Sequence, residues 1–357
     1  MIRVLIVDDS PTAQQLLNHL LSQDPSVQVI GIAKDGKEAL AMVSRHHPDV
    51  VTMDVVMPGI DGIETTRTLM ESNPLPIIVV SSVLNQKEVN LTFQALAAGA
   101  LGVVDKPTSA LPSSESGRRL LQMVKAMAEV KVVRRRPISS RPSDSAAVPS
   151  LPMGTDLKSV PIGREGFRGI AIGASTGGPS ILAHILSELP GDFPLPILIV
   201  QHISQGFIKG MVDWLKDSTR LLVELAQQAA HLLPGHVYLA PDDWQFGLNS
   251  ADRVTLSKDP PENNLRPSVS YLFRSVAKQW GEQSIGVLLS GMGSDGAREL
   301  GAIRQQGGVT IAQNEESSAV FGMPGAAVAL GAVDFLLGPE QIVTTLESLA
   351  HQSMSGR

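Results

Sequence analysis

The chain has 357 residues, a length that suits two folded units, each large enough to bury a core of its own. Hydrophobic residues make up 43%, charged residues 18%, and the formal net charge is -6, which argues against a disordered chain and against a protein built to coat nucleic acid. The absence of cysteine excludes disulfides, thiolate metal sites and cysteine nucleophiles, so covalent catalysis would have to use serine, threonine, lysine or a carboxylate.

Short apolar runs alternate with amphipathic stretches over residues 1–128. The runs predict strands and the stretches predict helices, which together indicate an α/β unit with a parallel sheet. The predicted strands are 4–7, 27–32, 50–53, 77–80 and 102–104.

Residues 129–165 lose this pattern and are rich in arginine, proline and serine, which indicates a linker that proline stiffens in places. Periodic structure resumes in residues 166–357 and predicts a second α/β unit, with a small antiparallel addition around residues 235–257. Its predicted strands are 169–172, 196–200, 235–240, 254–256, 284–289, 308–312 and 332–337.

No segment of the sequence looks like a membrane anchor. The first apolar run, residues 4–7, is too short for the core of a signal peptide. No later run approaches the roughly 18 apolar residues that a membrane span needs. We therefore expect a cytoplasmic protein that does not insert into membranes.

Polar residues follow the predicted strands of the first unit. Asp8 and Asp9 follow the first strand, Asp54 the third, Ser81 the fourth and Lys106 the fifth. The carboxyl ends of the strands of a doubly wound sheet meet at one crevice, so these side chains should lie together. One aspartate after a strand can simply cap a helix, but five such placements are hard to attribute to capping. Clustered carboxylates need a cation, and oxygen ligands suit Mg²⁺.

Three motifs of this unit, Val-Asp-Asp-Ser, Met-Asp-Val-Val-Met-Pro-Gly-Ile-Asp-Gly and Val-Asp-Lys-Pro, resemble the receiver domain of two-component response regulators. The resemblance covers residues 2–128 and implies a flavodoxin-like, doubly wound fold. It implies that Asp54 is phosphorylated by a histidine kinase. It also implies that Asp8, Asp9, Asp54 and the backbone carbonyl of Val56 hold Mg²⁺.

The same resemblance implies that Ser81 and Lys106 contact the phosphoryl group, where Lys106 would neutralise its charge. It further implies a cis peptide before Pro107. Val103 stands where many receivers carry a switching aromatic residue, which argues against an aromatic switch in this chain.

The second unit contains a candidate nucleophile. Ser175 lies between a predicted strand and a predicted helix, in a glycine-rich turn that would expose its hydroxyl. His202 ends the next predicted strand, and Asp295 follows another apolar strand. A serine hydroxyl needs a histidine to take its proton, and the histidine needs a carboxylate to orient it. A lone histidine or glycine-framed serine is usually structural, and what favours catalysis by these three residues is the family resemblance of the motifs around them.

Residues 168–348 contain Gly-Ala-Ser-Thr-Gly-Gly-Pro, Arg-Pro-Ser-Val and Gly-Met-Gly-Ser-Asp-Gly-Ala, which resemble the CheB family of chemotaxis methylesterases. The resemblance implies a doubly wound α/β catalytic domain without a cofactor. It implies that Ser175 is the nucleophile, His202 the general base and acid, and Asp295 the orienting carboxylate. It also implies that the amide of Met292 is an oxyanion donor and that Thr176 positions His202.

The implied function is phosphorylation-regulated removal of methyl groups from glutamate methyl esters of methyl-accepting chemotaxis receptors, with release of methanol. Deamidation of receptor glutamines is implied as a second activity. The implied partners are these receptors and the chemotaxis histidine kinase, with recruitment to receptor arrays. Ser270 departs from the family pattern, in which an acidic residue is common, and so leaves the details of the nearby groove open.

Other functions fit the sequence less well. A dinucleotide site would need glycine where Ser175 stands, and an ordinary α/β-hydrolase places its histidine after the acid, whereas His202 precedes Asp295. A response regulator with a non-catalytic binding domain remains the alternative. For the enzyme, we expect that the unphosphorylated receiver covers the crevice holding Ser175 and that phosphorylation weakens this packing.

Overall fold

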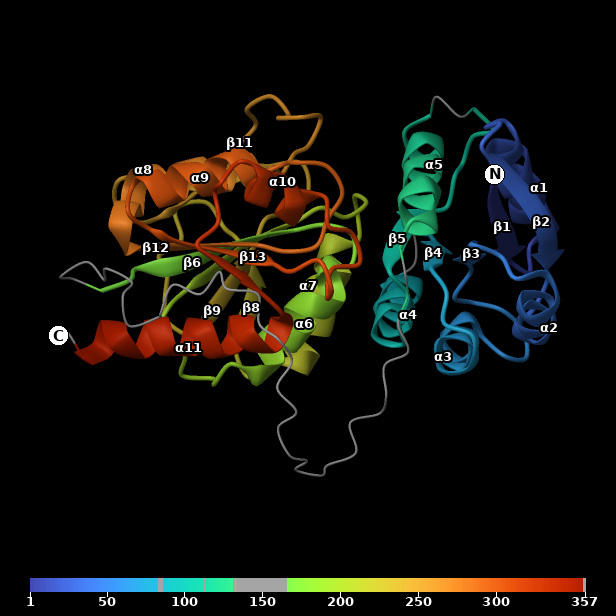
Figure 1. Ribbon diagram of the computed structural model, residues 1–357, viewed down its shortest axis with the longest axis horizontal. Coiled ribbons are helices and arrows are strands. Elements are labelled where there is room, and N and C mark those ends of the chain that lie inside the picture. Colours follow the sequence, from blue (N-terminus) through green and yellow to red (C-terminus); the bar gives the residue numbers. More distant parts are fainter. Residues whose placement is uncertain (83–85, 112–113, 131, 133–165, 356–357) are drawn as a thin grey trace.

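The computed structural model describes residues 1–82, 86–111, 114–130, 132 and 166–355, which form two α/β units (Figure 1). Most of the predicted linker, residues 133–165, lies outside the described residues. Within the described ranges, no helix combines the length and the apolar composition that crossing a lipid bilayer requires.

The first unit is a parallel five-stranded sheet in the order β2-β1-β3-β4-β5, as the flavodoxin-like prediction requires. Helices α1 and α5 pack on one face, and α2, α3 and α4 on the other (Figure 1). The strands are β1 (Ile2–Val7), β2 (Val27–Ala33), β3 (Val50–Met53), β4 (Ile77–Ser81) and β5 (Gly102–Asp105). The helices are α1 (Pro11–Ser22), α2 (Gly36–His46), α3 (Gly62–Ser72), α4 (Gln86–Ala97) and α5 (Glu115–Ala128).

Local sequence explains where these elements begin. The central strands β3 and β4 are buried at every residue because helices cover both faces of the sheet, and this is why they read as continuous apolar runs. Helices α1, α2 and α3 start at Ser10, Asp35 and Asp61, whose side chains accept hydrogen bonds from free amides of the first turn.

The second unit is a parallel seven-stranded sheet in the order β14-β13-β12-β6-β7-β9-β8. Helices α8, α9 and α10 lie on one face, and α6, α7 and α11 on the other (Figure 1). The strands are β6 (Gly169–Ala174), β7 (Ile197–Gln201), β8 (Leu222–Leu225), β9 (His236–Leu239), β12 (Ser284–Leu288), β13 (Val309–Gln313) and β14 (Phe335–Leu337). The helices are α6 (Gly178–Glu188), α7 (Ile208–Ser218), α8 (Val269–Trp280), α9 (Ala297–Gln305), α10 (Met323–Ala329) and α11 (Pro339–Ser355), with a 3-10 turn at Gly281–Gln283.

The antiparallel addition is present but smaller than predicted. It consists of β10 (Gln245–Leu248) paired with β11 (Val254–Ser257), whereas β9 joins the main parallel sheet. The sequence did not reveal β10 because Gly247 interrupts it, and glycine is needed there since an added Cβ would lie 2.9 Å from Ser275 Oγ. It also did not reveal the edge strand β8, whose first residue, Leu222, is exposed.

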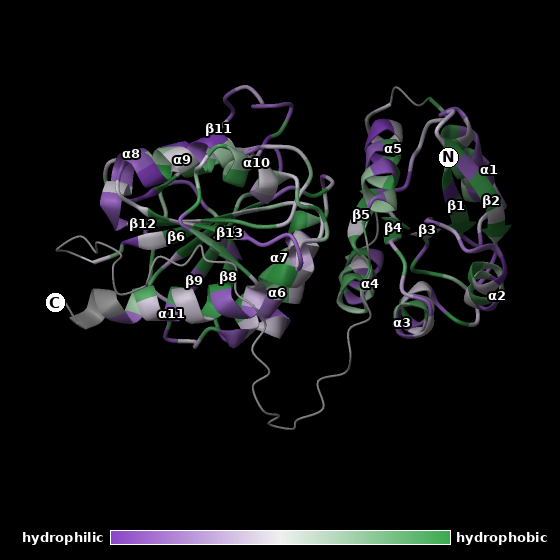
Figure 2. Cartoon of the chain, in the orientation of Figure 1, coloured by the Kyte–Doolittle hydropathy of each residue, from purple (hydrophilic) through white to green (hydrophobic). Residues whose placement is uncertain are grey.

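The two units pack together through α4 and α7. The rings of Phe93 on α4 and Trp214 on α7 stack with centroids 5.5 Å apart. Gly210 allows this approach, because an added Cβ would lie 2.2 Å from Val89 Cγ1. The central strands of both sheets are strongly hydrophobic in Figure 2, and one buried apolar cluster includes residues of both units. An apolar contact therefore joins the two units.

Candidate functional site

The predicted acidic pocket of the first unit is present. One carboxylate oxygen each of Asp8, Asp9 and Asp54 lies within 4.8 Å of the others. Lys106 Nζ is 3.1 Å from Asp8 Oδ2 and 2.7 Å from Asp54 Oδ2. The buried Asp8 Oδ2 nevertheless makes no hydrogen bond. Three carboxylates facing one ammonium group leave negative charge to be balanced, and an all-oxygen donor set fits Mg²⁺.

The charges in this pocket act on Asp54 in opposite directions. Burial raises the pKa of the Asp54 carboxyl, the hydrogen bond and positive charge of Lys106 lower it, and Asp8 raises it again. The net result is a pKa above the usual value. A cation bound beside Asp54 would favour the anionic form of its carboxylate.

The remaining predicted residues of the first unit lie at the same end of the sheet. Ser81 is buried at the end of β4, and its hydroxyl makes no hydrogen bond. Val56 lies two residues after Asp54, to which its amide donates at 3.4 Å. The expected cis peptide before Pro107 is absent. Among the described residues, the cis peptide bond is the one between Arg266 and Pro267.

Mg²⁺ binding to the full chain provides a direct test of this pocket. We expect Asp8→Asn to weaken Mg²⁺ binding about tenfold or more, because the substitution removes one of three converging charges. Isothermal titration calorimetry with MgCl₂ measures the effect. Asp61→Asn is the matched control, since Asp61 caps α3 outside the cluster and asparagine caps equally well. Equal Mg²⁺ affinity in both variants would contradict a metal site at Asp8.

In the second unit, three neighbouring strands of the sheet lead to the predicted triad. β6 lies between β12 and β7, which is the point where the strand order reverses. Ala174 pairs with Gln201 in the β6–β7 register, so Ser175 and His202 leave the sheet side by side. The amide of His202 donates to Ala174 O at 2.9 Å, and the amide of Ser175 donates to Ser290 O at 3.0 Å.

His202 and Asp295 are in direct contact, with 3.0 Å between His202 Nε2 and Asp295 Oδ2. Both line one cavity of about 650 Å³ together with the half-buried Ser175. His202 Nε2 faces this carboxylate oxygen of Asp295 at ion-pair distance but makes no hydrogen bond in this structure. The described part of the chain contains no direct hydrogen bond between Ser175 and the imidazole, and such catalytic bonds commonly tighten only when substrate binds.

The amino-terminal turn of α8 holds the Asp295 carboxylate. Ser268 Oγ donates to Oδ1 at 2.9 Å, the Val269 amide donates to Oδ2 at 2.7 Å, and the Ser270 amide donates to Oδ1 at 3.2 Å. Burial opposes ionisation, but the close contact and charge of His202, the Ser270 side chain and the Val269 amide outweigh it and lower the pKa of Asp295 to about 2. Asp295 is therefore an anion at neutral pH, placed where free helix amides favour negative charge.

Sequence reasoning missed the role of Gln201. Its buried side chain donates from Nε2 to Ser175 O at 2.8 Å and to His202 O at 2.8 Å. It thereby links the backbone of Ser175 to that of His202. The signal was a polar residue that ends an otherwise apolar buried strand. The Thr176 hydroxyl lies 3.8 Å from Met123 Sδ of the first unit.

The loop after β12 packs directly against Ser175. A Cβ at Gly291 would lie 2.6 Å from Ser175 Cβ and 2.4 Å from Met323 Sδ, so only glycine fits. Met292 lines the cavity and its side chain is partly exposed. Gly293 follows with φ of +84°, a conformation that favours glycine. This loop brings a turn of backbone to the edge of the cavity beside Ser175.

Comparisons with known proteins identify the family. Residues 170–346 match the model of the CheB methylesterase family, and residues 4–112 match the response regulator receiver domain. The chain belongs to the CheB methylesterase family. It is 48% identical to protein-glutamate methylesterase/protein-glutamine glutaminase 1 of Syntrophus aciditrophicus, over 98% of this chain and 99% of that protein. It is 50% identical to protein-glutamate methylesterase/protein-glutamine glutaminase 4 of Geobacter metallireducens, again over 98% and 99%.

A solved structure agrees with this membership. The crystal structure of the Thermotoga maritima CheB methylesterase catalytic domain aligns with a TM-score of 0.50 and 36% identity, over 51% of this chain and 98% of that one. The predicted fold class, a receiver domain joined to a CheB-type α/β domain, is therefore confirmed.

Proposed function

We propose that this CheB-family protein is a phosphorylation-regulated serine esterase that hydrolyses glutamate methyl esters of methyl-accepting chemotaxis receptors and deamidates receptor glutamines. The observation that carries the proposal is the contact between His202 and the ionised Asp295 in the cavity that Ser175 also lines. Relatives that share nearly the full length of the chain are named for both activities.

The reaction starts with proton transfer from Ser175 to His202 as the serine oxygen attacks the ester carbonyl. Asp295 stabilises the imidazolium that forms and stays unprotonated throughout. His202 then returns the proton to the departing oxygen, which leaves as methanol. A water molecule hydrolyses the resulting glutamyl ester of Ser175 by the same steps in reverse order. Glutamine follows the same route, but its amide nitrogen leaves only when protonated and so depends more on His202 as an acid.

Backbone amides near Ser175 would hold the oxyanion of the tetrahedral intermediate. In a strand–turn–helix arrangement, the backbone amide of the residue after the nucleophile points toward the oxyanion. In this chain that residue is Thr176. The amide of Met292 would be the second donor, since Met292 lines the same cavity. The amino terminus of α6 adds a favourable dipole. One such donor is typically worth about 10² to 10³ in rate.

Replacement of the nucleophile tests the hydrolase directly. Ser175→Ala should lower methanol release from methylated receptor membranes by at least about 10³-fold, because it removes the attacking oxygen. Ser187→Ala on α6, the helix that follows the Ser175 turn, is the control, since its hydroxyl donates to His184 O. Undiminished activity in Ser175→Ala would instead favour the binding-domain alternative.

The orienting carboxylate gives a second test. Asp295→Asn should lower kcat by about 10⁴-fold and change KM little, because an amide fixes the wrong tautomer of His202 and cannot stabilise an imidazolium. Steady-state kinetics of methanol release measures both constants. Asp259→Asn serves as the control, since Asp259 is exposed and bonds to Tyr271. A kcat of Asp295→Asn within tenfold of the native value would rule out this role.

For the receiver, spanning residues 1–128, we propose Asp54 as the phosphoacceptor and the chemotaxis histidine kinase as phosphodonor. Asp8, Asp9 and Asp54 would hold Mg²⁺ with the carbonyl of Val56, and the ion would neutralise charge on the phosphoryl group. Support comes from the carboxylate cluster and from the receiver family match. The phosphoryl contacts would come from two further residues, Ser81 and Lys106.

We further propose that the receiver restricts access to the catalytic crevice. The cavity that contains Ser175 is lined in part by the receiver, through Leu101, Gly102, Val103, Val104, Arg119, Gln122 and Met123. The amide of Gly177, two residues after the nucleophile, donates to Leu101 O at 3.0 Å. β5 continues from this contact to Lys106, which bonds to Asp54. Phosphorylation of Asp54 would thus act on the strand that borders the cavity.

The interdomain contact makes regulation testable. Trp214→Ala should raise methanol release in the absence of a phosphodonor about two- to tenfold, since a stacked aromatic pair contributes about 0.5–1.5 kcal/mol to packing. The gain from adding acetyl phosphate should shrink correspondingly. Leu222→Ala, which removes an exposed apolar side chain from β8, is the control. Lower basal activity in Trp214→Ala than in Leu222→Ala would contradict occlusion by the receiver.

The proposed substrates also suggest where the enzyme acts. The methylated segments of chemotaxis receptors would be met in the cytoplasm, at receptor arrays. The residues 129–165 would connect the receiver to a catalytic domain of residues 166–357 and keep the two at high local concentration.

A further inference from the structure

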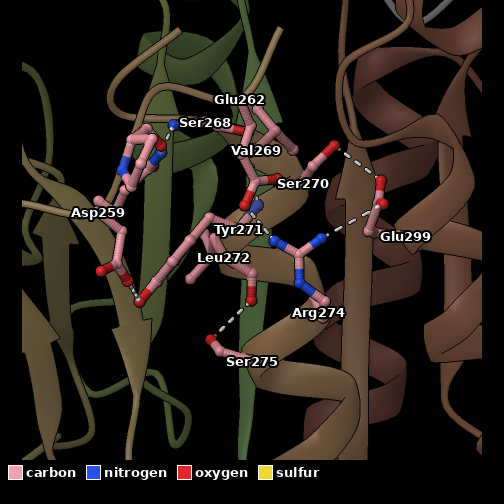
Figure 3. A network of polar contacts seen from close by, with 12 residues as sticks. Asp259, Glu262, Ser268, Val269, Ser270, Tyr271, Leu272, Arg274, Ser275 and Glu299 are labelled. Atoms are coloured by element: carbon pink, nitrogen blue, oxygen red, sulfur yellow. Dashed lines mark hydrogen bonds and ion pairs between the residues drawn. The ribbon is translucent and has the colours of Figure 1, made fainter. Parts of the chain in front are cut away.

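We propose that Ser270 and Glu299 are positioning residues for Asp295, an inference that rests on the serine esterase function proposed above. Ser270 lies in the first turn of α8 and Glu299 in the first turn of α9. Asp295 lies between these two turns. The hydrogen bonds that join Ser270 to Gly296 and Glu299, which we call the α8–α9 clasp, fix the distance between the turns. Figure 3 shows the bond between Ser270 and Glu299.

The α8 side of the clasp contains the donors to the carboxylate. Ser268, Val269 and Ser270 all bond to Asp295 through the first turn of this helix. A shift of that turn would therefore move the carboxylate relative to His202. The contact between Asp295 and His202 spans 3.0 Å, and a displacement of about 1 Å in an active site can cost up to about 10² in rate.

The α9 side of the clasp contains the residue that carries the carboxylate. The amide of Gly296, next to Asp295, donates to Ser270 Oγ at 2.9 Å. Ser270 Oγ in turn donates to Glu299 Oε2 at 2.7 Å. A hydroxyl has one proton, so its donation to Glu299 leaves a lone pair for the Gly296 amide and defines its orientation. Ser270 is buried, which removes competition from water.

A cation completes the network. Arg274 Nη1 lies 3.6 Å from Glu299 Oε1, and Nη2 of the same guanidinium contacts Glu262 (Figure 3). Ser270 and Arg274 are four residues apart on one face of α8, so Glu299 spans two successive turns of the helix. The side chain of Glu299 is only 16% exposed. These contacts hold Glu299 in the rotamer that accepts the Ser270 proton.

The clasp uses Ser270 Oγ, whereas the groups that hydrogen-bond to Asp295 are others. Without the Ser270 hydroxyl, Asp295 keeps the Ser268 hydroxyl, both backbone amides and His202, because none of these contacts uses Ser270 Oγ. The Ser270 side chain also helps to lower the pKa of Asp295, so its removal should raise that pKa toward the usual value. Removal of the Ser270 hydroxyl should therefore lower the rate of the chemical step and leave the affinity for substrate unchanged. For Ser270→Ala we expect about a tenfold lower kcat with KM within about twofold of the native value.

The test uses the full chain activated with acetyl phosphate and measures kcat and KM for methanol release from methylated receptor membranes. Glu299→Ala should match Ser270→Ala, and the double variant should be no slower than either single variant, because both changes remove the same clasp. Glu299→Gln should recover most of the activity, since its amide oxygen still accepts the Ser270 proton. Glu299→Ala also provides the test on its own if Ser270→Ala does not fold.

Ser275→Ala is the matched control. Ser275 lies on the same helix and donates to Leu272 O at 2.8 Å (Figure 3). It accepts from the Leu248 amide at 3.1 Å, and neither bond involves Asp295. It should lower the melting temperature as Ser270→Ala does and leave kcat native. A kcat of Ser270→Ala equal to that of Ser275→Ala, or additive losses in the double variant, would overturn the proposal.

Two further variants separate this inference from the proposed function. In an Asp295→Asn background, Ser270→Ala should cause no further loss, because the clasp acts through Asp295. Ser175→Ala must be inactive. If Ser175→Ala retains methanol release, the esterase proposal fails. If Ser175→Ala is inactive but Ser270→Ala equals the Ser275→Ala control, only the clasp fails.

Discussion

The buried carboxylate of Asp295 is the group around which the catalytic domain is organised. Burying an anion is costly unless it is paired and hydrogen-bonded, and this one has an imidazole on one side and helix amides on the other. These partners lie at the end of β7 and at the start of α8. Asp295 therefore contacts segments that are about 25 to 90 residues away from it in sequence. The resulting pKa of about 2 keeps the carboxylate ionised beside His202.

Both sites of the molecule follow from one property of parallel sheets. Residues at the carboxyl ends of adjacent strands lie together, so Asp8 and Asp54 meet in one unit and Ser175 and His202 in the other. The two crevices differ in chemistry because one gathers carboxylates and the other gathers a hydroxyl, an imidazole and a single acid. β5 relates them, since it ends near Lys106 and begins next to the turn after Ser175.

The CheB family match and the geometry support the hydrolase over a binding module for distinct reasons. The family match covers the catalytic domain, whereas the geometry shows an ionised acid held against a histidine in a cavity that also exposes the serine. The departure at Ser270 has a structural explanation in this chain. Its hydroxyl reaches the carboxylate of Glu299, so an acidic group is present at this place on α9.

The sequence alone determined the two α/β units and the residues at their strand ends, because buried parallel strands are continuous apolar runs and the polar residues that follow them stand out. Only the tertiary structure decided which backbone and side-chain groups hydrogen-bond to the residues at those strand ends. The bonds of Gln201, the donors from the first turn of α8 and the contact of Gly177 with Leu101 depend on distances between segments far apart in the chain. No local pattern encodes such distances, since they are set by how helices pack across the sheet and by how the two units meet.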